Sequence, residues 1–202
     1  MSLQQHRLLL LRHGETEWSS SGRHTSRTDL ELTETGREQA EVTADALARL
    51  QLQDPLVVSS PRKRALVTAE LAGLSVNEVS PLIAEWDYGA YEGLTTPEIR
   101  RDVPDWLVWT HGCPEGESVA QVSDRADAAI AMALQHMASR DVLFVGHGHF
   151  SRAVITRWIE LPLSQGIRFA MVAASIAVCG FEHGMRQLTA LTLTGYPHPC
   201  AP

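Results

Sequence analysis

The sequence predicts an α/β protein of three layers (α/β/α), in which helices cover both faces of a mostly parallel sheet with an antiparallel edge strand. Short apolar runs of strand length alternate with segments of helical period along the chain. The runs at 8–11 and 141–145 are apolar almost throughout, as expected for strands that are covered on both faces. Two further runs, 176–181 and 187–193, flank a short turn. The alternation favours parallel pairing, and the terminal hairpin supplies the antiparallel edge.

The first predicted helix follows the strand at 8–11. Thr33 or Thr35 offers its N-cap, and Glu38 completes a Thr-x-x-Glu capping box. Its buried face is predicted from three apolar residues near helical spacing: Ala40, Leu47 and Leu50.

The middle of the chain predicts a strand at 55–59, a short helix and a weaker strand at 75–79. Pro61 stands where the first turn of a helix tolerates proline. The helix then continues through Ala65, Leu66, Ala69 and Ala72. A tryptophan-rich stretch from 81 to 116 shows no regular period, so we expect it to be irregular.

The second half of the chain predicts one long helix that is capped by Ser118 and Gln121. Its apolar stripe comprises Val119, Val122, Ala126, Ile130, Ala133 and Met137. The terminal hairpin turns at 182–184, where Gly184 supplies a permissive φ. Because no repeat and no low-complexity linker interrupts the chain, we expect one domain spanning 1–202.

Composition narrows the classes of ligand. The chain has 202 residues, of which 44% are hydrophobic, so it is long enough to bury a sizeable core. A formal net charge of -7 argues against nucleic acid or an anionic membrane as the main partner, because phosphate-rich surfaces are bound by clustered Lys and Arg. No apolar stretch is long enough to span a bilayer or to form the core of a signal peptide. An anionic ligand would therefore need a local positive pocket.

The three cysteines are widely spaced, odd in number and free of any CxxC pattern: Cys113, Cys179 and Cys200. This pattern predicts neither a disulfide framework nor a thiolate metal site. We expect reduced thiols in a cytoplasmic protein.

Polar residues follow three of the predicted strands directly. These residues are Arg12, His13 and Gly14 after the first strand, Ser59, Ser60, Arg62, Lys63 and Arg64 at the second, and Gly146, His147, Gly148 and His149 at the late one. In open α/β sheets the ligand site lies beyond the carboxyl ends of the strands. Guanidinium groups engage phosphate oxygens in pairs, and a neutral imidazole can attack phosphorus. The sequence therefore predicts a phosphate-ester pocket that neutralises charge without a metal or other cofactor.

The segment "LLRHGETEW" resembles the signature of the histidine phosphatase superfamily, in its phosphoglycerate mutase branch. Five further segments resemble blocks of that family in the right order: "GRHTSRTDLELTETGREQA", "SSPRKRALVTA", "AEWDYGAYEG", "PEGES" and "LFVGHG". The stretches 81–100 and 104–114 are also similar to mycobacterial-type acid phosphatases of the branch. The resemblance covers nearly the whole chain and implies a phosphoglycerate mutase-like fold.

The resemblance assigns roles by position. It implies that His13 is the nucleophile that becomes phosphorylated, that Arg12 and Arg64 bind the phosphoryl oxygens, and that His147 stabilises the charge of the transition state. Glu85 would be the general acid, which is compatible with an acidic optimum. Contacts to the substrate are implied for Arg23, Thr25 and the N–H of Gly148.

Several alternatives stay open. Glu92 competes with Glu85 for the acid role, and His147 with His149 has a spacing that sometimes ligates a metal. The chain departs from the common family pattern at four positions around the pocket: Ser19, Ser26, Arg62 and His149. Five further residues are either pocket liners or structural residues: His24, Tyr88, Trp106, Trp109 and His111. Glu117 suits the N-terminus of the long helix better than a ligand.

Three functions fit these residues. The first is a metal-independent phosphatase that acts on small phosphomonoesters through phosphohistidine. The second is a cofactor-dependent phosphoglycerate mutase, and the third is a non-catalytic module that binds a phosphorylated ligand. The resemblance also leaves a homodimer through a sheet edge open. Surplus cations near the pocket, namely Arg23, Arg62 and His149, suggest a second anionic group on the substrate.

Overall fold

A computed structural model describes residues 6–196. It contains a six-stranded mixed sheet with the strand order β3-β2-β4-β1-β5-β6. The strands are β1 (Leu8–Arg12), β2 (Leu56–Ser59), β3 (Glu78–Val79), β4 (Val142–Gly146), β5 (Ile176–Glu182) and β6 (Met185–Leu193). β1, β2, β3 and β4 pair in parallel, whereas β5 runs antiparallel to both β1 and β6. The predicted fold class is confirmed.

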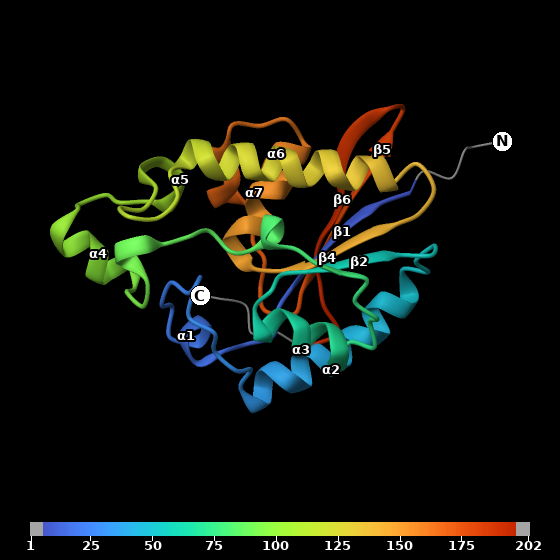
Figure 1. Cartoon of the computed structure of the whole chain (residues 1–202), viewed down its shortest axis with the longest axis horizontal. Coiled ribbons are helices and arrows are strands. Elements are labelled where there is room, and N and C mark those ends of the chain that lie inside the picture. Colours follow the sequence, from blue (N-terminus) through green and yellow to red (C-terminus); the bar gives the residue numbers. More distant parts are fainter. Residues whose placement is uncertain (1–5, 197–202) are drawn as a thin grey trace.

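Helices form a layer on each side of the sheet (Figure 1). They are α1 (Glu17–Ser20), α2 (Glu34–Arg49), α3 (Lys63–Leu71), α4 (Thr96–Asp102), α5 (Val108–His111), α6 (Val119–His136) and α7 (Gly148–Trp158), with 3-10 turns η1 (Pro81–Ile83), η2 (Gly89–Tyr91) and η3 (Leu163–Arg168). α6 and α7 cover one face, and α2 and α3 cover the other.

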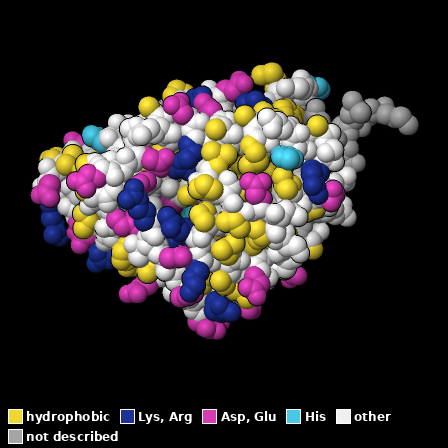
Figure 2. Space-filling model, viewed as in Figure 1, with side chains coloured by type: hydrophobic (Ala, Val, Ile, Leu, Met, Phe, Trp, Pro, Cys, Tyr) yellow, Lys and Arg dark blue, Asp and Glu magenta, His cyan; other side chains and the backbone are white. Residues whose placement is uncertain are grey.

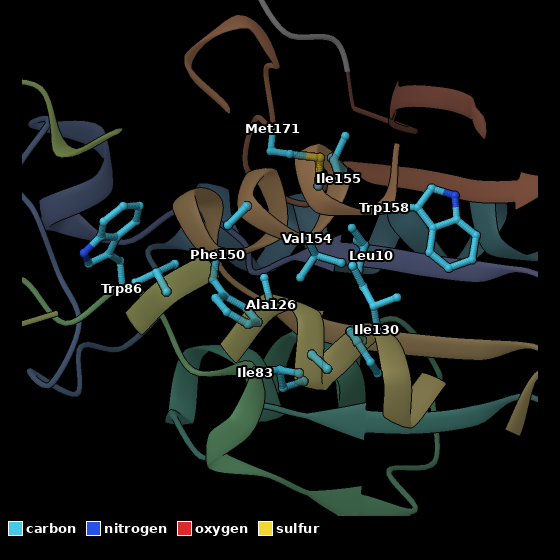
Figure 3. Close-up of a cluster of buried hydrophobic side chains, with 14 of the residues drawn as sticks. Leu10, Ile83, Trp86, Ala126, Ile130, Phe150, Val154, Ile155, Trp158 and Met171 are labelled. Carbon is cyan, nitrogen blue, oxygen red and sulfur yellow. The ribbon is translucent and has the colours of Figure 1, made fainter. Parts of the chain in front are cut away.

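Alternation along the strands divides the core into two parts. Leu8 and Leu10 of β1 belong to the larger cluster with α6 and α7, whereas Leu9 and Leu11 belong to the cluster on the side of α2 and α3. Figure 3 shows the larger cluster, in which large side chains from both helices meet the sheet. Because both faces are buried, the continuous apolar run of β1 is explained.

The caps of the two long helices differ in how well the sequence indicates them. The predicted box of Ser118 and Gln121 is present at α6. At α2, Thr33 is the cap and accepts a hydrogen bond from the N–H of Gly36, so the predicted box with Glu38 is wrong. Thr33 also hydrogen-bonds Glu15 in the segment after β1. This contact ties the start of the helix to the end of the first strand.

Three other predictions need correction. α3 begins at Lys63 with Arg62 at its N-cap, so Pro61 precedes the helix instead of standing in its first turn. The strand predicted at 75–79 is reduced to β3, because the Asn77 side chain accepts the N–H of Val57 where a strand partner would lie. The stretch 81–116, predicted irregular, contains α4 and α5.

The terminal hairpin turns as predicted, with Gly184 at φ 80°. Cys113 and Cys179 are buried and free, and Cys200 lies outside the described residues. Figure 2 shows Lys and Arg side chains mixed with Asp and Glu over the visible face, without a broad basic field. No helix in the described range is long and apolar enough to cross a membrane.

Candidate active site

A cavity of about 280 Å³ opens beyond the carboxyl ends of β1 and β4, at the N-terminus of α7. Parallel strands place the residues that follow them at one edge of the sheet, as the sequence predicts. The lining residues are Arg12, His13, Thr16, Ser19, Gly22, Arg23, His24, Thr25, Glu85, Tyr88, Thr96, Gly148, His149, Arg152 and Met171.

His13 is buried with a defined tautomer. Its Nδ1 lies 2.6 Å from the carbonyl oxygen of Gly14. A carbonyl only accepts, so Nδ1 carries the proton and Nε2 keeps its lone pair. Burial and the nearby charges of Arg64 and Arg12 hold the pKa of His13 well below its ordinary value. The ring is therefore neutral near pH 7, which is the form that can attack an electrophile.

His147 lies directly behind His13, with ring centroids 5.2 Å apart. Its Nε2 lies 2.7 Å from the hydroxyl oxygen of Ser60. Burial lowers the pKa of His147 well below its ordinary value, and the charges of Arg64, Arg62 and Arg12 act in the same direction. This imidazole is also neutral.

The guanidinium groups beside the two histidines are only partly satisfied. Arg12 donates to the carbonyl oxygen of Met171, and burial lowers its pKa. Among the residues that the structure describes, five buried side-chain nitrogens have no hydrogen-bond partner, and four of them belong to this cluster: Arg12 Nε, Arg62 Nε, Arg64 Nε and His147 Nδ1. Unpaired buried donors are rare, and a group of them indicates a site for an anion. We call these four residues the cradle.

Arg64 also shapes the loop at 25–28. It is buried, and it donates to the carbonyl oxygens of Thr25, Ser26 and Thr28. Glu92 holds the same loop from the other side by accepting from the N–H groups of Ser26 and Thr28. Glu92 is thus a hydrogen-bonding residue of the loop and lies outside the cavity lining.

Glu85 reaches the cavity from the segment after η1. Its Oε1 accepts from the N–H groups of Trp86 and Phe150, and its Oε2 accepts from the N–H of His149 at 3.0 Å. The carboxylate therefore closes the N-terminus of α7, where the helix dipole favours negative charge. One of its four lone-pair positions is left for another partner.

Close approach requires one glycine near the cavity and constrains a second. A Cβ on Gly14 would lie 2.2 Å from the backbone oxygen of Gly36, which is too close for any side chain. A Cβ on Gly148 would lie 3.3 Å from the guanidinium of Arg12. A side chain at the start of α7 would therefore make the Arg12 guanidinium shift by a few tenths of an ångström.

The outer wall of the cavity is aromatic. The hydroxyl of Tyr88 lies 2.6 Å from Nδ1 of His149, and the ring of His24 packs against Tyr88. Burial raises the pKa of Tyr88 and lowers that of His149, so both groups are neutral. Burial also lowers the pKa of His24 to about 4, against a smaller opposite effect of Glu92. Arg152 completes this wall.

Arg152 and Met171 are lining residues that sequence reasoning missed. Arg152 packs over the ring of Trp109 and donates to the carbonyl oxygen of Gly166, and burial lowers its pKa to about 10. Its position four residues after Gly148 on one helix face is a signal that could have found it. Met171 lies in a coil segment, where no sequence pattern points to the cavity.

The remaining predicted residues are placed as follows. Arg23 and Thr25 line the cavity. His111 is exposed on α5, and Glu117 pairs with Arg125. Trp106 and Trp109 are buried core residues whose rings contact His24 and His149 respectively, so they support the wall from behind.

His147 and His149 do not share a ligand position. The first ring faces Ser60, and the second faces Tyr88. Within residues 6–196, no three His, Cys, Asp or Glu side chains form a group that could hold a metal ion.

Known proteins resemble this chain over nearly its whole length. The family model of the histidine phosphatase superfamily (branch 1) matches residues 8–194. An acid phosphatase of Mycobacterium tuberculosis is 69% identical over 201 residues, which cover 100% of this chain and 99% of that protein. Phosphoserine phosphatase 1 of Hydrogenobacter thermophilus is 30% identical, over 93% of this chain and 92% of that protein.

A solved structure of an open reading frame product from Mycobacterium tuberculosis superposes with a TM-score of 0.94 at 71% identity, and covers 95% of this chain and 99% of that one. The predicted resemblance is thereby confirmed, both for the family and for the mycobacterial acid phosphatase within it. The chain belongs to the histidine phosphatase superfamily and is a phosphoric monoester hydrolase.

Proposed function

We propose that this enzyme hydrolyses small phosphomonoesters without a metal ion, through a phosphohistidine on Nε2 of His13. The observation that carries the proposal is the cradle: its four residues have unpaired buried nitrogens, and two of them, Arg12 and Arg64, act on the neutral imidazole of His13, which has a free lone pair. Guanidinium groups supply the positive charge that phosphoryl transfer needs. Arg12 and Arg64 bind the phosphoryl oxygens, and His147 donates to the charge that develops on them.

The reaction has two steps. In the first, the lone pair of His13 Nε2 attacks phosphorus, the bond from phosphorus to the ester oxygen breaks, and Glu85 gives that oxygen a proton. In the second, Glu85 takes a proton from water, the resulting hydroxide attacks phosphorus, and the N–P bond breaks to restore His13. The free lone-pair position on Oε2 of Glu85 is where this proton is held. Because the first step needs a proton on Glu85, we propose that the activity has an acidic optimum.

The rest of the cavity holds the alcohol part of the ester. Arg23 and Thr25 contact the substrate from the loop side, and the N–H of Gly148 contacts the phosphoryl group. The names of the relatives, an acid phosphatase and a phosphoserine phosphatase, support hydrolysis over mutase activity. We also propose that residues 1–202 form one domain in the cytoplasm, where its cysteines stay reduced.

The test is release of inorganic phosphate from an aryl phosphate between about pH 4 and about pH 8 with a chelator present. Wild type is compared with His13→Ala and with His111→Ala, which alters an exposed histidine outside the cavity. We expect chelator-resistant hydrolysis that is lost only in His13→Ala. Fast isomerisation of 3-phosphoglycerate with little phosphate released would assign a mutase, and inactivity in both assays would assign a binding module.

A further inference from the structure

The contact between Ser60 and His147 is fixed by the sheet. Ser60 follows β2 and His147 follows β4, and these two strands are parallel neighbours. The N–H of Ser60 donates to the carbonyl oxygen of Val145, which extends the ladder by one residue. Both side chains are buried, and the 2.7 Å distance from Ser60 Oγ to His147 Nε2 is that of a good hydrogen bond.

A neutral imidazole has only one N–H, so the partner of one nitrogen decides what the other presents. The hydroxyl oxygen of Ser60 already accepts a long hydrogen bond from the N–H of Arg62, at 3.4 Å. No other acceptor for the hydroxyl proton of Ser60 is found among the described residues, so this proton can go to Nε2 of His147. When Nε2 accepts, Nδ1 must carry the proton.

His147 Nδ1 is one of the four buried nitrogens of the cradle that have no hydrogen-bond partner among the described residues. A proton on Nδ1 would face the phosphoryl oxygens as a hydrogen-bond donor, whereas a lone pair there would repel them. Burial lowers the pKa of His147 well below its ordinary value, and the charges of Arg64 and Arg62 act in the same direction, so the ring carries one proton near pH 7. The site therefore needs a device that selects one tautomer.

We propose that Ser60 is this device: its hydroxyl donates to Nε2 of His147 and keeps the proton on Nδ1, facing the phosphoryl group. Ser60 touches no reacting atom and is a positioning residue. The inference rests on the proposed function, because that function gives His147 the phosphoryl oxygens as partners.

His13 has the same tautomer, but it is set by a partner of the opposite kind and presents its other nitrogen. The carbonyl oxygen of Gly14 also holds a proton on Nδ1, but there the free nitrogen is Nε2, which presents its lone pair. One neutral histidine thus offers a nucleophile and the other a donor. A backbone carbonyl sets the first, and the Ser60 hydroxyl sets the second.

The first test is long-range ¹H–¹⁵N NMR of the resting enzyme labelled on its histidines, near pH 7. His147 is assigned by the signals that His147→Gln removes. We expect the Nδ1–H pattern in wild type and in Ser59→Ala, and its loss in Ser60→Ala. Ser59 is the matched control, because its buried hydroxyl donates to the carbonyl oxygen of Ser60 and not to His147.

An Nε2–H pattern in wild type, or an unchanged pattern in Ser60→Ala, would overturn the proposal. The wild-type spectrum decides this even where a variant fails to fold. It also needs no turnover, so a failure here is separate from a failure of His13 to act as nucleophile.

The second test is kinetic. Ser60→Ala is expected to lower kcat by about 10- to 100-fold with KM changed by less than about twofold, because the lost donor acts in the transition state. Ser60→Thr, which keeps the hydroxyl, is expected to restore kcat to within about fivefold of wild type. A kcat for Ser60→Ala equal to that of Ser59→Ala would contradict a positioning role.

Discussion

Buried polar groups lie at both ends of strand β4. Those at its start have hydrogen-bond partners, whereas several at its other end lack them. At the start, Asp141 accepts hydrogen bonds from the N–H of Arg7 at 2.8 Å, the Arg7 guanidinium at 2.9 Å and the N–H of Gln53 at 3.0 Å. In the part of the chain that the structure describes, the one unpaired side-chain nitrogen there, His6 Nδ1, lies 3.8 Å from the Asp141 carboxylate. At the other end, His147 and the arginines of the cradle have nitrogens that find no hydrogen-bond partner among the described protein groups.

This difference distinguishes a hydrogen-bonded cluster that stabilises the fold from a site that binds a ligand. A buried charge with all its partners joins segments of the fold, and the loss of one member leaves the others unpaired. A group of buried cations without an anion opposes folding, and a bound anion offsets that cost. Changes at Asp141 should therefore alter stability without altering chemistry, and changes in the cradle should do the reverse.

The largest expected effect is on catalysis by Arg12→Met. We expect kcat/KM to fall by about 10³-fold, because a guanidinium group that binds the phosphoryl oxygens is lost. The free energy of unfolding should change by less than about 1 kcal/mol, because an apolar chain replaces a buried cation. Phosphate release and urea unfolding measure the two quantities, and Arg168→Met, at an exposed arginine, is the control. Destabilisation above about 2 kcal/mol would break the comparison.

The next effect is on stability by Asp141→Ala. We expect the free energy of unfolding to fall by about 3 kcal/mol, because Arg7 and the N–H of Gln53 lose a buried acceptor. Activity per folded molecule should stay within about twofold of wild type. Asp127→Ala, which removes an exposed pair with Arg157, should cost less than about 1 kcal/mol in the same urea titration. Equal losses of unfolding free energy would show that the buried Asp141 cluster stabilises the fold no more than an exposed ion pair does.

The stability contributed by the cavity wall and that contributed by the Asp141 cluster should also respond differently to acid. His24 has a folded pKa of about 4, below its unfolded value of about 6.5, so the unfolded chain binds a proton that the folded chain refuses. Stability should therefore fall by about 2 kcal/mol from about pH 6.5 to about pH 4.5 through this residue. His24→Phe should flatten that fall in thermal unfolding at the two pH values. An unchanged slope would contradict the neutral His24.

The Asp141 carboxyl behaves in the opposite sense. Burial opposes its ionisation, but hydrogen bonds from Arg7 and Gln53 outweigh burial and leave its pKa below the ordinary value. Its contribution is complete above the unfolded pKa of about 3.9 and is lost only as the pH falls through the folded pKa. Asp141→Ala should therefore leave the slope between about pH 6.5 and about pH 4.5 unchanged.

The smallest expected effect is at the surface. Ser118→Ala removes one half of the capping box of α6 and should cost about 1 kcal/mol of unfolding free energy, with kcat and KM unchanged. Ser139→Ala, at a serine beyond the C-terminus of that helix, is the control for the substitution itself. A changed KM in Ser118→Ala would connect this helix to the cavity and weaken the separation of regions.

The sequence predicted the parts of the fold that depend on local pattern. The apolar runs of β1 and β4, the cap at Ser118 and the turn at Gly184 each contain their own signal. No local signal marks the start of α7, because the N–H of His149 donates to Glu85, which lies 64 residues earlier in the chain. The shortening of β3 likewise depends on a side-chain contact between Asn77 and β2.

The same division applies to the site. Arg12, His13 and His147 follow buried strands directly, so strand order alone brings them together. The contacts that set their chemistry were not predictable, because they join residues from separate elements: Ser60 with His147, and Tyr88 with His149. The sequence places Arg62 among the surplus cations near the pocket, but not its effect: Arg62 is half-buried, and its charge lowers the pKa of both Arg64 and His147.

The most direct test of the account is to trap the covalent intermediate. Wild type and His13→Ala would be mixed with a ³²P-labelled phosphomonoester, quenched in base within the first turnover, digested and mapped by mass spectrometry. We expect an acid-labile, base-stable phosphoryl group on the peptide that contains His13, and none in His13→Ala. A phosphoryl group on another residue, or steady hydrolysis by His13→Ala at the wild-type rate, would contradict it.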